Sequence, residues 1–419
     1  MNTLQKTKFE KIFLSLNMLS VYRGLVKNPI VSRFIELSKL MCSVENDFES
    51  LNKIISLYSE ICEILYNSKF DSNLSSYIYN AILYDENKFS IECFCSNKIE
   101  ENLFNAAQND YKILMLLAGL TSEEVIELIK NKFCAYSDLL LNLPTYKHNP
   151  EIKKNPPIFE KIMCFYRKNS FGSFAFYTTF KFDKDLVLKP SINHDNIKLA
   201  DLKLYQMQKN LFIQNVQAFI ENKPNLNTIL YGDRGCGKSS TVKAVLNEFS
   251  QKNLRLIQVQ KDNLSNLSIL FSKLSGYPLK FIIFIDDLSF NENDGDFSTL
   301  KAMLEGSIEK QPQNIMICVT SNRRHLIKES FKARQGDELH LSDTIDETLS
   351  LADRFGLVIN YNSPRKDDYL EIVKLLAKDK LLQIDELALV QGAEAWALEK
   401  AARSPRIASQ YIEFLQSTQ

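Results

Sequence analysis

The chain has 419 residues, and its 51 basic side chains are matched by 51 acidic ones, so no global charge excess indicates a polyanionic partner or a basic substrate. With 45% hydrophobic and 24% charged residues, the composition is typical of a soluble protein long enough for two or three domains. The sequence has no run of about 18 apolar residues, so we expect no membrane span. Its eight cysteines are scattered without C-x-x-C spacing, which favours a reduced, cytoplasmic protein without a zinc site.

Residues 1–140 carry the apolar spacing of amphipathic helices. Leu51, Ile54 and Tyr58 share one helical face, and the segment from Thr121 to Glu124 has the sequence of a capping box that opens a helix. We therefore predict a mainly helical N-terminal domain over residues 1–140. Residues 114–129 could also be read as a helix-turn-helix, but a helical hairpin packed into a bundle is commoner for this pattern, so we assign no DNA binding to it.

Prolines mixed with lysines interrupt the helical pattern between residues 143 and 157, which indicates a connecting segment. Beyond it, Phe174, Phe176, Phe180 and Phe182 lie at a period of two, which predicts a strand or hairpin with one aromatic face. Such a face can stack nucleic-acid bases, but burial against helices is its commoner role. We expect a connecting segment with a β-hairpin over residues 141–194.

Short apolar strands alternate with helices from residue 195 onward, which predicts a parallel α/β sheet flanked by helices over residues 195–362. The expected strands are 227–231, 254–259, 281–285, 315–320 and 357–360. After Pro364 the strand pattern stops, and the sequence predicts a C-terminal helical lid over residues 363–419. The expected lid helices are 367–377, 385–402 and 405–415.

Three of the 12 glycines lie within six positions of one another, at 232, 235 and 237. They belong to the phosphate-binding pattern G-x-x-x-x-G-K-[ST], which runs from Gly232 to Ser239. In such a loop, successive backbone N–H groups point at the phosphates, Lys238 reaches the β and γ oxygens, and the Ser239 hydroxyl binds Mg²⁺. A strand precedes the loop and a helix follows it, so the N-terminus of that helix faces the anion. The residues of this loop that we predict to bind the nucleotide are Gly232, Asp233, Arg234, Gly235, Cys236, Gly237, Lys238, Ser239 and Ser240.

Polar residues follow the later strands at the edge where ligands bind to parallel sheets. Asp286 and Asp287 end one strand; we expect Asp286 to hold Mg²⁺ with Ser239, and Asp287 to orient or deprotonate the attacking water. Asn322 follows the next strand and can hydrogen-bond the γ-phosphate or this water. Arg354 precedes the last strand, where it can reach the phosphates of a neighbouring subunit.

Arg406 lies at the start of the final helix. There it can report the nucleotide state by touching the γ-phosphate, and the alternative role is a surface ion pair.

This order of features resembles the AAA+ ATPases, with Walker A at 232–239, Walker B at 285–287, sensor 1 at Asn322, an arginine finger at Arg354 and sensor 2 at Arg406. More narrowly, the motifs at 286–290, 320–326 and 353–356 are similar to an uncharacterised bacterial family of AAA+ ATP-binding proteins with a helical N-terminal region. The resemblance implies the P-loop NTPase fold of AAA+ type, ATP or ADP with Mg²⁺, a homo-oligomer that uses Arg354 in trans, and a protein client. It also implies that residues 202–209 pack near the adenine, with Tyr205 as the aromatic residue that follows a glycine in relatives.

The chain departs from the AAA+ pattern at three positions. Asp287 stands where many relatives have Glu, Leu204 replaces the glycine before the aromatic residue, and Asp353 replaces a Ser before the finger. We expect an ATPase that drives or times the rearrangement of a partner, with slow or partner-stimulated hydrolysis.

Two alternatives stay open. One is a nucleotide-gated adaptor with little or no turnover, which the Asp at position 287 favours. The other is a loader or remodeller on DNA, based on the basic residues Arg323, Arg324, Lys328, Lys332 and Arg334, although such a run is commonly a solvated surface. A small-molecule kinase is disfavoured because the sequence shows no acceptor site.

Overall fold

A computed structural model describes residues 3–44, 46–96, 98–151, 157–192, 195–289, 300, 311–322 and 354–418. The chain divides into two compact units, Met1–Phe176 and Tyr177–Gln419, and each is described by itself below. Among the helices in the described ranges, none is both long enough and apolar enough to cross a bilayer.

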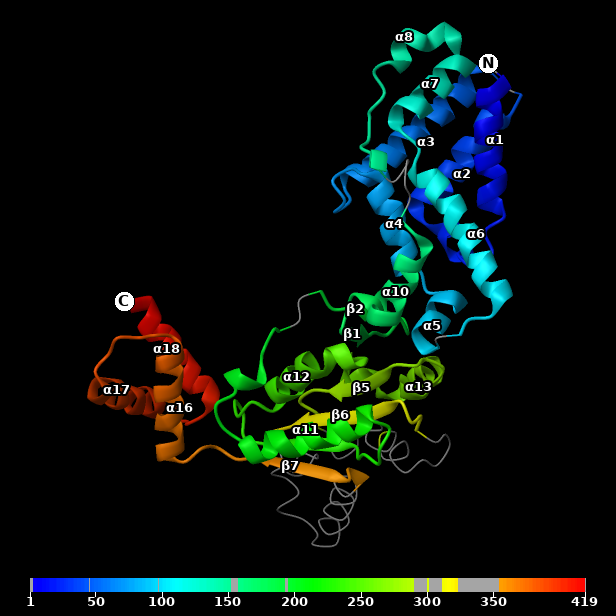
Figure 1. The fold of residues 1–419 in the computed structure, drawn as a ribbon. Helices are drawn as coiled ribbons and strands as arrows, with labels where there is room; N and C mark the ends of the chain where they lie inside the picture. The colour runs from blue at the N-terminus through cyan, green and yellow to red at the C-terminus, as the bar shows by residue number, and fades with distance from the viewer. Residues whose placement is uncertain are drawn as a thin grey trace, which may run out of the picture. The chain divides into compact units, whose positions relative to one another are not determined.

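The first unit is helical (Figure 1, blue to green). Its helices are α1 (Thr3–Asn17), α2 (Pro29–Cys42), α3 (Phe48–Tyr66), α4 (Leu74–Tyr84), α5 (Lys88–Cys95), α6 (Glu101–Ala118), α7 (Ser122–Lys132), α8 (Ser137–Leu140) and α10 (Phe159–Asn169), with short 3₁₀ turns η1 (Arg23–Lys27), η2 (Cys134–Tyr136) and η3 (Gly172–Ala175). The apolar faces of these helices meet in one core that includes Leu16, Phe34, Ile54 and Leu114. The predicted capping box forms at α7, where Thr121 and Glu124 bond each other's backbone N–H.

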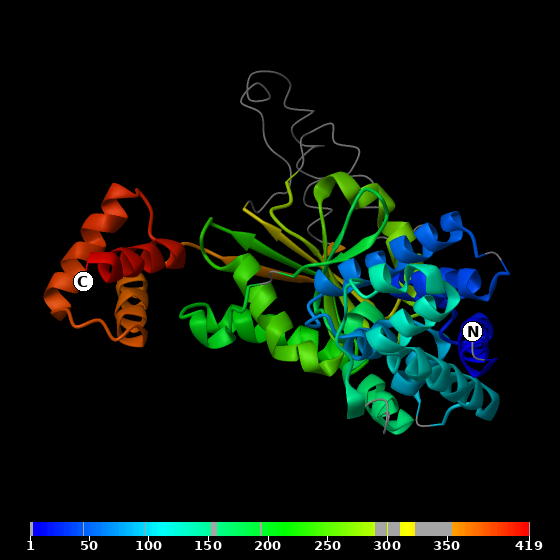
Figure 2. The same ribbon diagram turned by 90° about the horizontal axis from the view of Figure 1, so that it is seen from above.

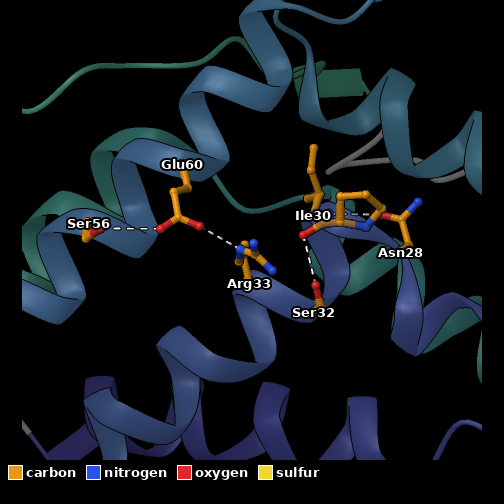
Figure 3. Close-up of polar contacts among 7 residues, drawn as sticks. Asn28, Ile30, Ser32, Arg33, Ser56 and Glu60 are labelled. Atoms are coloured by element: carbon orange, nitrogen blue, oxygen red, sulfur yellow. Dashed lines mark hydrogen bonds and ion pairs between the residues drawn. The ribbon is translucent and has the colours of Figure 1, made fainter.

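Polar side chains join α2 and α3 where they are partly exposed, as the contacts in Figure 3 illustrate. Arg33 donates from Nε to Glu60 Oε2 at 2.7 Å, and Ser56 donates to the other carboxylate oxygen at 3.3 Å. The side chains of Arg33 and Glu60 are 36% and 40% exposed, so this ion pair contributes less than about 1 kcal/mol to stability. The pairing of α2 with α3 therefore rests on their buried apolar faces.

The boundary between the units differs from the predicted connecting segment over 141–194. The prolines at the two ends of this stretch are bonded to the first unit, since Tyr58 donates to the Pro144 carbonyl at 2.8 Å and Tyr111 to the Pro157 carbonyl at 2.5 Å. The aromatic alternation is not one strand, because residues 172–175 form a 3₁₀ turn and Phe176 packs against the first core. The alternating aromatic residues from Phe174 to Phe182 thus belong partly to the end of the first unit and partly to the first strand of the second.

The second unit contains, in its described part, a seven-stranded sheet in the order β2-β1-β4-β5-β6-β3-β7. Its strands are β1 (Thr179–Phe182), β2 (Leu188–Pro190), β3 (Thr228–Gly232), β4 (Leu254–Val259), β5 (Lys280–Ile285), β6 (Ile315–Ser321) and β7 (Leu357–Tyr361). Neighbouring strands are parallel except β1 and β2, which form an antiparallel hairpin that extends this sheet. The predicted fold class is confirmed: a mostly parallel sheet with flanking helices, a helical N-terminal region and C-terminal helices.

Helices α11 (Gln206–Ile220) and α12 (Lys238–Phe249) cover the face of the sheet that carries Leu230, Phe284 and Cys318. Helix α13 (Leu267–Ser275) connects β4 to β5. The last three helices form a group with their own small core around Tyr369 and Ala408, visible in orange and red in Figure 2. They are α16 (Lys366–Asp379), α17 (Glu386–Glu399) and α18 (Pro405–Thr418), and we call them the lid.

One buried carboxyl group fixes the turn after α1. Asp110 on α6 is 2% exposed, and its Oδ2 accepts backbone N–H bonds from Ser20, Val21 and Tyr22 at 2.9, 2.7 and 2.9 Å. Each of these N–H groups would otherwise be left without a partner as the turn packs on the core.

We predict that Asp110→Ala lowers the free energy of unfolding of the first unit by about 3 kcal/mol, because it leaves several backbone donors unsatisfied. The measurement is urea denaturation of the full chain followed by hydrogen exchange on peptides from residues 18–25. The chain's single tryptophan, Trp396, lies in the lid, so its fluorescence follows the second unit separately and should not change. Asp138→Ala, at an exposed position of α8, is the control. Equal exchange in Asp110→Ala and Asp138→Ala would contradict the assigned role.

Candidate functional site

A cavity of about 690 Å³ lies in the second unit between the carboxyl ends of the central strands and the lid. The core side supplies residues from the loop after β3 and from the ends of β5 and β6, and the lid side supplies residues from α16 and α18. Its lining residues are Asp201, Leu202, Lys203, Arg234, Gly235, Gly237, Lys238, Ser239, Ser240, Asp286, Asp287, Thr320, Asn322, Ile372, Leu376, Pro405, Arg406 and Ser409. The position follows from the parallel order, because β3, β6 and β5 all end at the same edge of the sheet.

The glycine-rich loop between β3 and α12 has the backbone form that its sequence predicts. Gly237 is the residue before α12 and has φ +89°, and Gly232 has φ +135°. A Cβ atom at Gly232 would lie 2.2 Å from the Tyr361 carbonyl oxygen on β7. Only glycine allows β3 to pass so close to β7 in this conformation. The N-terminus of α12 therefore opens into the cavity with its first backbone N–H groups available to an anion.

Lys238 is held among oxygen atoms at the start of α12. Its Nζ donates to the carbonyls of Gly232 and Asp233, each at 2.8 Å, and to Asn322 Oδ1 at 3.0 Å. The residue is 6% exposed, and burial lowers the pKa of its ammonium group, while Cys236, Asp233 and the acidic pair act in the opposite direction. The ammonium group therefore lies beside the loop that would hold phosphates.

The acidic pair after β5, Asp286 and Asp287, is hydrogen-bonded to the start of α12 and to the residue that follows β6. Asp286 Oδ1 accepts from Ser239 Oγ at 2.5 Å, and Asn322 Nδ2 donates to Asp287 Oδ1. Asn322 therefore joins Lys238 to Asp287. The structure brings together the predicted residues Lys238, Ser239, Asp286, Asp287 and Asn322 in one network at the cavity wall.

The donor set suits Mg²⁺. A hydroxyl and a carboxylate, Ser239 and Asp286, are in contact and face a cavity large enough for phosphates, and Mg²⁺ is commonly bound by one or two carboxylates with substrate phosphates and water. Within the described ranges, no group of three or more His, Cys, Asp or Glu residues could form a metal cage by itself. A metal here would therefore be held jointly by these two residues and a nucleotide.

The lid contacts the phosphate-binding loop directly. The backbone N–H of Arg406, in the first turn of α18, donates to the Gly235 carbonyl at 3.3 Å, and the Arg406 side chain lines the cavity. A Cβ atom at Gly235, which has φ +78°, would lie 2.8 Å from Ser404 Oγ. A displacement of this loop at Gly235 would therefore disturb its contacts with Ser404 and with the start of α18.

The segment between β7 and α16, residues 362–365, also bonds to the loop, and we call it the hinge. Asp233 Oδ2 accepts from the backbone N–H of Ser363 at 2.8 Å, and the Asp233 N–H donates to the Tyr361 carbonyl at 2.9 Å. Hydrogen bonding by Ser363 lowers the pKa of the Asp233 carboxyl below its usual value. Asp233 thus faces the hinge, and it is not among the residues that line the cavity.

Tyr205 also packs against the hinge. It precedes α11 with φ +65°, its hydroxyl donates to the Asn362 carbonyl at 2.5 Å, and its ring centroid lies 4.9 Å from that of Tyr361. Burial raises the pKa of its phenol. The residue with the left-handed backbone conformation is therefore Tyr205 itself. Leu204, which stands where relatives have a glycine, packs against the lid core. Leu202 and Lys203, just before it, do line the cavity.

Three further predicted residues lie outside the cavity lining. Cys236 is buried in the core, and burial raises the pKa of its thiol; Gly232 packs against β7. Arg354 is exposed and precedes β7 at its amino end, whereas the cavity lies at the carboxyl end of the paired strand β3. The five paired residues of β3 and β7 separate these ends by about 13 Å. Asp353 and the basic residues from Arg323 to Arg334 lie outside the described residues.

Sequence reasoning did not single out several residues of the cavity wall. Thr320 opens the motif at 320–326, two positions before Asn322, but in an apolar strand it reads as an ordinary strand former and was given no role. Ile372 and Leu376 come from a helix without a motif, while Asp201 precedes the segment 202–209 and Ser409 lies one turn after Arg406. Only the folded arrangement of core and lid brings them to the site.

Comparison with known proteins supports the AAA+ resemblance. A curated relative, the "Holliday junction branch migration complex subunit RuvB" of Mycoplasmopsis pulmonis, is 26% identical over 185 residues, which is 44% of this chain and 55% of the relative. The chain thus spans about half the length of the curated relative that it matches. The predicted resemblance to AAA+ ATPases is confirmed at this level.

Solved structures similar to this chain include the "Thermotoga maritima RuvB Holliday junction branch migration motor" and a point mutant of the same protein. Each is 16% identical with a TM-score of 0.32, covering 52% of this chain and 72% of theirs. At that score the likeness adds no argument of its own. A family model described as "Protein of unknown function (DUF815)" matches residues 175–419, which is more than half of the chain and the whole of the second unit's described part. The chain therefore belongs to this DUF815 family.

Proposed function

We propose that the second unit binds ATP with Mg²⁺ in the cavity, hydrolyses it, and uses binding and hydrolysis to move the lid and so to drive or time the rearrangement of a partner. The observation that carries this proposal is the cavity itself, which has the phosphate-binding loop and acidic pair on one side and Arg406 of the lid on the other. Its volume of about 690 Å³ is within the range of small-molecule sites.

The proposal assigns the following roles to residues around the cavity. The loop N–H groups and Lys238 hold the β- and γ-phosphates, and Ser239 and Asp286 hold Mg²⁺, which supplies charge neutralisation at the phosphates. Asp287 orients the attacking water and is itself positioned by Asn322. Leu202, Ile372 and Leu376 provide the apolar surface for a base. Arg406 senses the γ-phosphate from the lid.

Arg354 acts on a neighbouring subunit in this proposal. The support is its place at the amino end of β7, at the far end of the sheet from its own cavity. A guanidinium there can serve a second copy but cannot reach the phosphates of its own chain by a side-chain rotation alone. Oligomerisation is then required for full activity.

A nucleotide-gated adaptor is the second candidate. The Asp287 side chain is one methylene shorter than Glu, and its carboxylate is already engaged by Asn322. If this arrangement does not activate water, occupancy of the cavity still changes the loop that contacts the lid. Stable nucleotide binding without turnover would favour this candidate over the first.

Work on DNA is a further alternative, and its support is the name of the curated relative, a Holliday junction branch migration complex subunit. The basic residues from Arg323 to Arg334 would supply the phosphate contacts. DNA binding that falls with rising salt, and that is lost when these residues are neutralised, would support this alternative.

We predict that Lys238→Ala weakens ATP binding by about 10- to 100-fold and abolishes phosphate release, because it removes a charged donor from the phosphate site. The control is Lys243→Ala, on the same helix, since Lys243 pairs with Asp195 at 2.6 Å and does not line the cavity. Calorimetric titration measures binding, and a phosphate-release assay measures turnover. Equal binding by both variants would refute the assigned site.

We predict that Arg354→Ala reduces turnover by about 10³-fold with little change in ATP affinity, because an arginine finger acts on the transition state. A mixture of Arg354→Ala and Lys238→Ala chains should recover activity, since an intact cavity in one subunit then meets an intact finger in another. Arg167→Ala, at an exposed arginine of the first unit, serves as the control. A monomer that hydrolyses ATP at the same specific rate at every protein concentration would rule out action in trans.

A further inference from the structure

Thr320 occupies a central position between the two halves of the phosphate site. It lies near the carboxyl end of β6, which runs between β3, the strand before the phosphate-binding loop, and β5, the strand before the acidic pair. Thr320 is 1% exposed, and it lines the cavity. Its register partner on β3 is Leu230, so β6 ends beside the start of the loop.

The Thr320 hydroxyl is bonded to both acidic residues. Its Oγ1 donates to Asp286 Oδ1 at 2.6 Å and accepts the backbone N–H of Asp287 at 2.9 Å. A hydroxyl can make these two bonds at once because it has one hydrogen to donate and two lone pairs to accept. One side chain therefore sets the orientation of the Asp286 carboxylate and the position of the Asp287 backbone.

The backbone around Thr320 fastens the same loop. The N–H of Leu288 donates to the Thr320 carbonyl at 2.8 Å, and Ser321 Oγ donates to the Leu288 carbonyl at 2.9 Å. Between these contacts Asp287 has φ +52°, a left-handed conformation that is unfavourable for a residue other than glycine. A strained conformation of this kind persists only where its surroundings hold it, and the bond to Thr320 is one of those restraints.

Asp286 Oδ1 receives two hydroxyl donors, Thr320 and Ser239. The two hydroxyl groups have different roles in the proposed function. Ser239 would bind the metal ion together with Asp286, whereas Thr320 lies on the strand behind the carboxylate. When Ser239 turns its oxygen toward a metal ion, the Thr320 hydroxyl remains to orient Asp286.

We propose that Thr320 is a positioning residue, which aims the Asp286 carboxylate for Mg²⁺ and holds Asp287 where its side chain meets Asn322. This inference rests on the proposed function and deepens it, since it assigns the metal dependence of nucleotide binding to a residue that had no role of its own in the motif at 320–326. Thr320 itself touches neither nucleotide nor metal in this scheme. Its effect reaches the site through the two aspartates.

The test compares Thr320→Val, which keeps the shape and removes the hydroxyl, with Thr320→Ser, which keeps the hydroxyl. Binding of a non-hydrolysable ATP analogue is titrated in the full chain, first with Mg²⁺ removed by EDTA and then at increasing Mg²⁺. We expect Thr320→Val to raise the Mg²⁺ concentration for half-maximal tight binding by about tenfold, as the loss of a hydrogen bond to a charged group implies. Metal-free affinity should stay within about twofold, and Thr320→Ser should restore the wild-type Mg²⁺ dependence.

A merely structural role would change metal-free and metal-dependent binding together, and the serine variant would not separate them. Thr320→Ala is a second variant without the hydroxyl and serves if the valine chain does not fold; Trp396 fluorescence reports folding of the second unit in each case. If wild type shows Mg²⁺-dependent binding and neither hydroxyl-free variant alters the dependence, this inference is overturned and the proposed function stands. If wild type binds no nucleotide, the proposed function fails and this inference fails with it.

Discussion

A buried ammonium group must be surrounded by oxygen atoms, and this requirement at Lys238 organises the second unit. Two carbonyls of its own loop and the side-chain oxygen of Asn322 meet the requirement. Asn322 can take part because β6 lies beside β3, and its amide nitrogen then reaches Asp287 beyond β5. The order of the strands thus turns three separate strand ends into one connected polar network. Phosphate oxygens would replace the protein oxygens around Lys238. Because Asn322 is bonded to both Lys238 and Asp287, nucleotide binding would also change the hydrogen bonding of the acidic pair.

The same loop is bonded to the hinge and to the start of α18, which would give nucleotide binding a mechanical consequence. Asp233 bonds the hinge through Ser363, and Gly235 lies against Ser404 and Arg406 at the start of α18. The first contact is a hydrogen bond, and at the second a Cβ atom on Gly235 would lie 2.8 Å from Ser404 Oγ. A loop that rearranges around phosphates would therefore break these contacts or shift the hinge and the start of α18 with it. This coupling is the physical basis for the proposal that the lid transmits the nucleotide state.

The motifs were predictable because their chemistry is local or follows from strand order. Gly232 to Ser239 form one continuous pattern, and Asp286 and Asn322 come together because parallel strands end at one edge. The apolar strands were located to within a residue or two, since each is a short buried run between helices. In contrast, the bond between Asp233 and Ser363 spans 130 positions of sequence, and no pattern indicates it. The role of Thr320 was not predicted, although the residue opens the motif at 320–326, because a threonine in a strand is unremarkable until its neighbours on the next strand are known.

The unit boundary was harder to predict for a related reason. The aromatic residues from Phe174 to Phe182 share one period but belong to two cores, with Phe176 in the first unit and Phe180 and Phe182 on β1 in the second. The prolines near residue 150 suggested a free linker, yet tyrosine hydroxyls bind their carbonyls to the first unit. Sequence pattern gives the period of a segment but not the partner against which it packs.

We propose that one ligand joins the phosphate-binding loop to the lid. Hydrogen exchange of the full chain, with and without Mg²⁺ and a non-hydrolysable ATP analogue, is the measurement that tests this proposal. We expect peptides covering residues 233–240 and 404–409 to become protected together in wild type, and neither to become protected in Lys238→Ala. Protection of the loop with unchanged exchange at the start of α18 would contradict it.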